Sequence, residues 1–120
     1  MKFIAALSCL LFAMISFSCA DYNRIVKTQD YEYKYEAAKQ FYAEGMYNRA
    51  ALLLQDVLSV LKGTEQGEES LYLTGLCNMK AHSYDAAATV FKKYYQTYPK
   101  GKYAEMARYN CAKSLYQLVS

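Results

Sequence analysis

The chain has 120 residues, of which 14 are Lys or Arg and 11 are Asp or Glu, so its formal net charge is +3. This length allows one domain. The basic residues do not gather into a patch or a stripe, and the sequence therefore offers no electrostatic basis for binding nucleic acid. We therefore expect no nucleic-acid partner. The choice among the other classes of function depends on the motifs along the chain.

The first eighteen residues have the pattern of a secretory signal peptide. Lys2 supplies a positive charge, and residues 3–17 are mainly apolar. This run is too short to cross a hydrocarbon core comfortably as a helix, which takes roughly 20 residues. A basic start, a short apolar run and small residues at its end are typical of a signal that is removed. A transmembrane anchor is the alternative.

A cysteine, Cys19, directly follows Ser18 at the end of the apolar run. This arrangement resembles the lipobox of bacterial lipoproteins, with Ser16 standing where Leu is usual. The resemblance implies cleavage before Cys19 and a diacylglycerol on its thiol, which would anchor the protein to a membrane without spanning it. Residues 1–18 are then the signal peptide, and we expect 19–30 to be a lipid-anchored linker. A cysteine beside an ordinary cleavage site is the alternative.

The rest of the chain repeats itself at an offset of 37 residues. The matching sets are Tyr35, Tyr72 and Tyr109; Ala38, Gly75 and Ala112; Tyr47 and Tyr84; Ala50 and Ala87; and Leu54 and Phe91. Self-similarity at a fixed period of this size is typical of a solenoid. The pattern predicts repeats at 31–67 and 68–104 and an incomplete third at 105–120.

Each copy is predicted to be a pair of helices, because its apolar residues recur at spacings of three and four. In the first copy, Asp30 is expected to cap a helix that Gly45 closes, and Gly63 closes the second helix, which begins at Tyr47. The predicted helices of the second copy are 68–80, and 84–98 with Ser83 as its cap. The third copy has one helix, 103–118.

The turn of the first hairpin carries the pattern Gly-x-Tyr-x-x-Ala-x-x-x-Leu, from Gly45 to Leu54. The second copy keeps the pattern with His82 at the glycine position and Phe91 at the leucine position. These features resemble the tetratricopeptide repeat (TPR). The expected fold is therefore all-α, a TPR-like helix-hairpin solenoid of about two and a half repeats. An ordinary helical bundle is the alternative.

The last predicted helix, 103–118, has no partner helix to cover its apolar residues. These residues are Ala107, Cys111, Ala112, Leu115 and Leu118. The terminal unit of a solenoid usually presents a polar outer face. We therefore expect the sequence to be the front part of a longer protein, and a lone helix acting as a cap is the alternative.

The first helices of the copies predict a ligand groove, because in TPR domains these helices line the concave face. The predicted stripe consists of Tyr35, Lys39, Tyr42, Tyr72, Leu76, Met79, Tyr109, Lys113 and Tyr116. Tyrosine combines a flat apolar face with a hydroxyl and is enriched where proteins bind one another. The sequence therefore predicts a peptide-binding surface; the alternative is that the tyrosines pack between the repeats.

The sequence contains no recognisable catalytic, metal or cofactor set. His82, the only histidine, precedes a predicted helix, where capping or exposure to solvent is expected. There is no C-x-x-C pair and no Gly-rich phosphate loop. Cys77 and Cys111 fall at apolar helical positions, which favours buried thiols over a disulfide. We expect a protein that is not an enzyme, with no cofactor beyond a covalent lipid on Cys19 and no small-molecule substrate.

A lipid-modified cysteine with TPR units close behind it resembles the amino-terminal part of BamD-like outer-membrane assembly lipoproteins of the Bacteroidetes type. The segments that carry the resemblance are 19–27, 30–38, 42–50, 91–99 and 103–109. It implies a protein anchored in the outer membrane, facing the periplasm, whose partners are the β-barrel assembly subunit and unfolded outer-membrane proteins. The alternatives are another periplasmic TPR adaptor, of the Tol–Pal or cell-division type, and a SusD-like glycan-binding lipoprotein.

Overall fold

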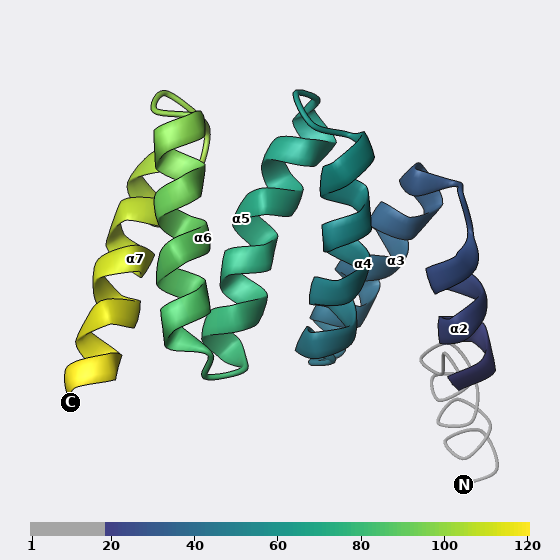
Figure 1. Cartoon of the computed structure of the whole chain (residues 1–120), viewed down its shortest axis with the longest axis horizontal. Helices are drawn as coiled ribbons and strands as arrows, with labels where there is room; N and C mark the ends of the chain where they lie inside the picture. The colour runs from purple at the N-terminus through teal and green to yellow at the C-terminus, as the bar shows by residue number, and fades with distance from the viewer. Residues whose placement is uncertain (1–18) are drawn as a thin grey trace, which may run out of the picture.

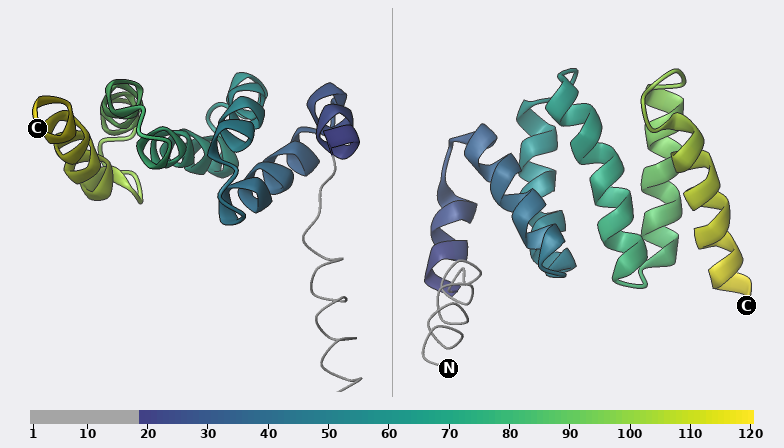
Figure 2. Two further views of the ribbon diagram at one scale, coloured as in Figure 1. Left: turned by 90° about the horizontal axis from the view of Figure 1, so that it is seen from below. Right: turned by 180° about the vertical axis from the view of Figure 1, so that it is seen from behind.

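The computed structural model describes residues 19–120, which form an all-α series of helix hairpins (Figure 1). The helices are α2 (Cys19–Lys27), α3 (Tyr31–Ala43), α4 (Tyr47–Val60), α5 (Glu65–Lys80), α6 (Tyr84–Thr97) and α7 (Ala104–Val119). From α3 onward each helix packs against the next, and the helices alternate between two layers (Figure 2). The predicted TPR-like solenoid is therefore confirmed, whereas the predicted signal peptide, residues 1–18, lies outside the described residues.

The helix ends follow the local signals in most places. The Asp30 carboxylate accepts a hydrogen bond of 3.1 Å from the backbone N–H of Tyr33 and so caps α3. Gly45 and Gly63 close α3 and α4 with φ of 80° and 85°, a left-handed conformation that glycine adopts without steric cost. His82, the equivalent of Gly45, adopts φ of 63° although it has a side chain.

One predicted helix start and one predicted capping contact are wrong. Helix α5 begins at Glu65, three residues before the predicted 68, because Thr64 caps it by accepting a hydrogen bond of 3.1 Å from the N–H of Gly67. The predicted boundary between the first two repeats therefore falls inside α5. Ser83 precedes α6 as predicted, but its side chain makes no capping hydrogen bond.

The expected linker at 19–30 is a packed helix over most of its length, which corrects the prediction. Tyr22 and Ile25 lie three residues apart and so share one face of α2. Ile25 is 2% exposed and belongs to the core formed by α3, α4 and α5, and the Tyr22 ring meets the ring of Phe41 edge-on with centroids 5.6 Å apart. Burial of this short apolar face stabilises the packing of the segment against the repeats.

Small residues lie where paired helices approach most closely, as the repeat pattern predicts. Ala38 is fully buried in the α3–α4 hairpin. At Gly75 in α5, an added Cβ would come within 2.6 Å of Cε1 of Phe91 in α6. The third member of the set, Ala112 in α7, is exposed, because no described helix covers that side of α7. None of the helices described from residue 19 onward is long and apolar enough to cross a membrane.

Candidate functional site

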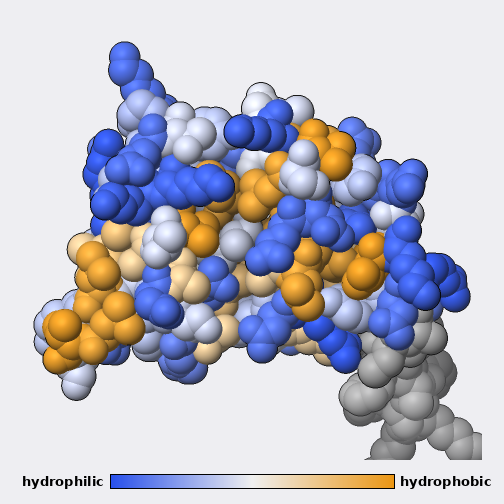
Figure 3. All heavy atoms as spheres, in the orientation of Figure 1, coloured by the Kyte–Doolittle hydropathy of each residue, from blue (hydrophilic) through white to orange (hydrophobic). Residues whose placement is uncertain are grey.

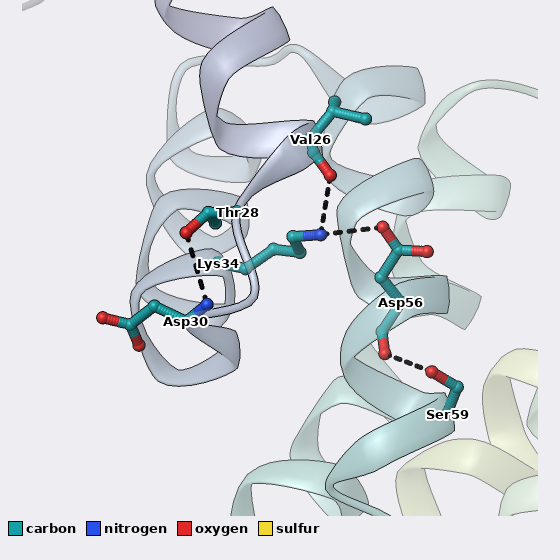
Figure 4. A network of polar contacts seen from close by, with 6 residues as sticks. All are labelled: Val26, Thr28, Asp30, Lys34, Asp56 and Ser59. Atoms are coloured by element: carbon teal, nitrogen blue, oxygen red, sulfur yellow. Dashed lines mark hydrogen bonds and ion pairs between the residues drawn. The ribbon is translucent and has the colours of Figure 1, made fainter.

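A buried lysine ties α2 to the first hairpin. The side chain of Lys34 in α3 is 3% exposed, and its Nζ donates to the carbonyl oxygen of Val26, 2.9 Å away, near the end of α2 (Figure 4). The same Nζ pairs with Oδ2 of Asp56 in α4, also at 2.9 Å. Three helices therefore meet at one ammonium group, which satisfies a carbonyl that the end of α2 would otherwise leave without an intrahelical partner.

The amino-terminal end of α2 is held by a second contact. The guanidinium of Arg49 in α4 lies 5.1 Å from the centroid of the Tyr22 ring, within the range of a cation–π interaction. Because Cys19 is the first residue of α2, a lipid on its thiol would place the repeats within about one short helix of the membrane surface. The structure does not describe the side chain of Cys19, so its lipidation stays a prediction.

In the first repeat, the predicted groove residues lie at a seam between helices. Tyr35 is 6% exposed, and burial raises the pKa of its hydroxyl. Lys39 Nζ lies 3.1 Å from Oε1 of Glu69 in α5, and the hydrogen bond to this carboxylate raises the pKa of the ammonium. Tyr42 is half-buried and meets the Tyr47 ring edge-on, with centroids 5.6 Å apart. These side chains join neighbouring helices and do not form an open surface.

In the second repeat, Tyr72 is enclosed by the elements that follow it. Its ring stacks on that of Tyr103 with centroids 4.6 Å apart, and its hydroxyl accepts a hydrogen bond of 3.1 Å from Nδ2 of Asn110 in α7. Burial raises the pKa of this hydroxyl. Leu76 and Met79 are half-buried against the core. The predicted stripe is therefore not continuous, because the tyrosines at its centre in the first two copies, Tyr35 and Tyr72, are buried.

The third copy of the stripe is more open to solvent than the first two. Tyr109 is 61% exposed, Tyr116 is 67% exposed, and Lys113 is exposed beside them on α7. The same helix exposes further apolar side chains, those of Met106, Leu115, Leu118 and Val119. We call the exposed set Glu105, Tyr109, Ala112, Leu115 and Tyr116 the outward face of α7. Figure 3 shows apolar residues gathered on α7 toward the carboxyl end of the chain.

Part of the exposed surface of α7 was predictable from the sequence. The repeat pattern leaves α7 without a partner helix, and Leu115 is half exposed as expected. Ala107 and Cys111 instead face α6 and are buried. Met106 and Val119 were missed because they fall outside the repeat pattern. Peptide binding by the exposed tyrosines stays a prediction.

The cysteines and the histidine are the other candidates for chemical function. Cys77 and Cys111 are buried free thiols, as predicted, and burial raises the pKa of the Cys77 thiol to about 12. The thiol of Cys111 lies 3.4 Å from the carbonyl oxygen of Ala88. His82 is exposed, with Nδ1 2.7 Å from the hydroxyl of Tyr84. Residues 19–120 hold no group of three or more His, Cys, Asp or Glu side chains placed to bind a metal.

Comparison with known proteins adds no assignment: no family model, no curated protein and no solved structure matches the chain.

Proposed function

We propose that the protein is a non-catalytic, lipid-anchored TPR-like scaffold of the outer-membrane β-barrel assembly machinery, which binds unfolded outer-membrane proteins and partner subunits on the periplasmic side. The observation that carries the proposal is the outward face of α7. Tyr109 and Tyr116 are both more than half exposed on a helix that also exposes Leu115. Contiguous apolar surface of this kind marks an interaction site more often than solvated surface.

The other support comes from the amino-terminal segment. The signal-like run and the lipobox-like Cys19 favour a membrane anchor, and α2 is fastened to the repeats through Lys34 and Ile25. The anchor and the repeats then move as one body, so a bound segment is held at a fixed distance from the membrane. This suits a scaffold that presents chains to a membrane-embedded partner.

The lipid anchor is tested by metabolic labelling with a palmitate analogue. Replacement of Cys19 by Ser should abolish the label and release the protein from the membrane fraction. Cys9→Ser, a substitution of the same kind within the predicted signal peptide, is the matched control and should leave the label in place. Equal labelling of the two variants would refute lipidation at Cys19.

The assembly role is tested by affinity capture from detergent-solubilised envelope with the tagged full chain. We expect recovery of the barrel-forming assembly subunit together with unfolded outer-membrane proteins, and loss of both in Tyr109→Ala/Tyr116→Ala. Tyr33→Ala, at a tyrosine that is 50% exposed on α3, is the matched control and should retain them. Recovery of Tol–Pal components or of glycan-uptake porins instead would overturn the assembly role.

A further inference from the structure

The contacts between α2 and α3 show at which end of the molecule Cys19 lies. Near the start of α2, the ring of Tyr22 meets Phe41 in the last turn of α3. Near the end of α2, the carbonyl oxygen of Val26 accepts a hydrogen bond from Lys34 in the first turn of α3. The two helices therefore run antiparallel. Cys19, the first residue of α2, thus lies at the same end as the turn between α3 and α4 (Figure 1).

The turn between α5 and α6 lies at this end as well. Nζ of Lys80, the last residue of α5, lies 5.9 Å from the centroid of the Tyr42 ring and 5.8 Å from that of the Tyr47 ring. These two rings stand on either side of the α3–α4 turn. In Figure 1 the start of α2 and both turns lie along the lower edge of the molecule. We call the segments that form it the turn edge: residues 19–24, 44–49 and 80–85.

Helix α2 is fastened to the repeats along its length. Ile25 is 2% exposed in the core, the Tyr22 ring lies against the Arg49 guanidinium, and the Val26 carbonyl is bound to Lys34. A lipid at the start of α2 would therefore fix more than the distance of the repeats from the membrane. It would also determine which end of the helices faces the membrane.

We propose that the turn edge lies on the lipid headgroups of the membrane that holds the anchor, with the helices standing on it and the opposite edge turned away. The inference rests on the lipid anchor of the proposed function and adds the surface that meets the membrane. The opposite edge holds the capped starts of α3 and α5, at Asp30 and Thr64. The two edges lie about 20 Å apart, because the 14 residues of α4 connect them at about 1.5 Å per residue.

The side chains of the turn edge suit a layer of headgroups. Tyrosine and the long cationic side chains combine an apolar body with a polar tip, and tyrosine is enriched at membrane–water interfaces. Lys80 is exposed beside its two tyrosine rings, and Met46 is 36% exposed in the α3–α4 turn.

The charges of the turn edge balance. Its cationic residues are Arg24, Arg49 and Lys80, and its acidic residues are Asp21, Glu44 and Asp85. An edge without net charge has no strong electrostatic attraction to a lipid surface. The acyl chains of the anchor would therefore supply most of the affinity, and the turn edge would supply the orientation.

The orientation is tested with an environment-sensitive fluorophore on single introduced cysteines. The lipid-bearing chain, isolated from membranes, is reconstituted into vesicles of phosphatidylethanolamine and phosphatidylglycerol that include a lipid with a nitroxide on its headgroup. Asn48→Cys and Ser83→Cys place the label at exposed positions of the turn edge. Lys62→Cys and Lys100→Cys place it at exposed positions of the opposite edge. The native thiols of Cys77 and Cys111 are buried and should not compete for the label.

We expect the nitroxide to quench the labels of the turn edge more strongly than those of the opposite edge, by about twofold or more, because the edges are about 20 Å apart. Lys80→Glu should reduce the quenching of the label at Ser83→Cys, because it gives the turn edge a net negative charge against lipid phosphates. Lys62→Glu, the same substitution on the opposite edge, is the matched control and should leave this quenching unchanged.

Equal quenching at all four positions would overturn the inference, because the repeats would then turn freely about the anchor. Stronger quenching on the opposite edge would overturn it as well, and so would quenching at Ser83→Cys that Lys80→Glu leaves intact. A chain that does not stay with the vesicles would overturn both the anchor and the orientation. Equal quenching in a chain that still captures the assembly components would sink only the orientation, and ordered quenching without their capture would sink only the assembly role.

Discussion

The two ends of the helix series place the same repeat position in opposite environments. Phe41 in α3 is fully buried, with the Tyr22 ring of α2 against it, whereas Leu115, two repeats later in α7, is 50% exposed. Both residues occupy equivalent positions on a first helix of the repeat. The comparison shows that a repeat position determines where a side chain points, and that the neighbouring element determines whether this side chain is core or surface.

The largest expected effect comes from truncating these two residues. Phe41→Ala should lower the free energy of unfolding by about 3–5 kcal/mol, because it removes a buried ring and leaves a cavity. Leu115→Ala should change it by less than about 0.5 kcal/mol, because the side chain is half in solvent. Urea unfolding followed by circular dichroism measures both. A cost for Leu115→Ala above half that of Phe41→Ala would mean that the outward face of α7 is covered.

The polar junction of α2 gives the next effect. Asp56→Ala leaves the buried Lys34 ammonium with the Val26 carbonyl and the Tyr31 ring, whose centroid lies 5.4 Å from Nζ. The substitution should cost roughly 1–3 kcal/mol, less than breaking a fully buried pair, because Asp56 is half exposed. The double variant Lys34→Met/Asp56→Ala removes the charge while keeping the apolar stem, and should cost less than the single variant. If the double variant is the less stable of the two, the ammonium stabilises the fold beyond its pairing with Asp56. Hydrogen exchange in α2 should rise in Asp56→Ala.

Removal of one hydroxyl compares the buried tyrosine with its exposed equivalent. Tyr72→Phe leaves the buried Nδ2 of Asn110 without its acceptor and should cost about 1–2 kcal/mol. Tyr109→Phe, one repeat later, should leave the free energy of unfolding unchanged within about 0.5 kcal/mol. Thermal and urea unfolding check both values. Equal costs would contradict the difference in burial between the two positions.

The smallest effect concerns the hairpin turns, where Gly45 and His82 share a left-handed conformation. Gly45→Ala should cost about 1 kcal/mol through backbone strain alone, since nothing lies within 4 Å of an added Cβ. His82→Gly should raise the free energy of unfolding by up to about 1 kcal/mol, because it relieves the backbone strain. The loss of the contact with Tyr84 reduces this gain. A loss of stability in His82→Gly would show that this contact outweighs the backbone strain.

The helix hairpins were predictable from the sequence, because Ala38, Gly75 and the turn residue Gly45 leave a periodic pattern of size and conformation. The start of α5 was not, since Thr64 lies before the first periodic residue. Helix α2 was not predicted, because only Tyr22 and Ile25 mark its packed face. Two residues are too few to establish a helical periodicity. The burial of Tyr35 and Tyr72 depends on the helices that follow them. The stripe was predicted from residue spacing within single helices, and this spacing carries no information about the neighbouring helices.

The most direct test of this burial pattern is nitration of tyrosines in the folded chain at neutral pH, with the modified positions identified by peptide mass spectrometry. Tyr35, Tyr72 and Tyr109 occupy one repeat position, and Tyr116 lies on the same face of α7 as Tyr109. The burial pattern predicts rapid nitration of Tyr109 and Tyr116 and protection of Tyr35 and Tyr72, with all four reacting once the chain is unfolded in urea. Nitration of Tyr35 and Tyr72 as fast as that of Tyr109 would contradict it, because the first two copies would then be open to solvent.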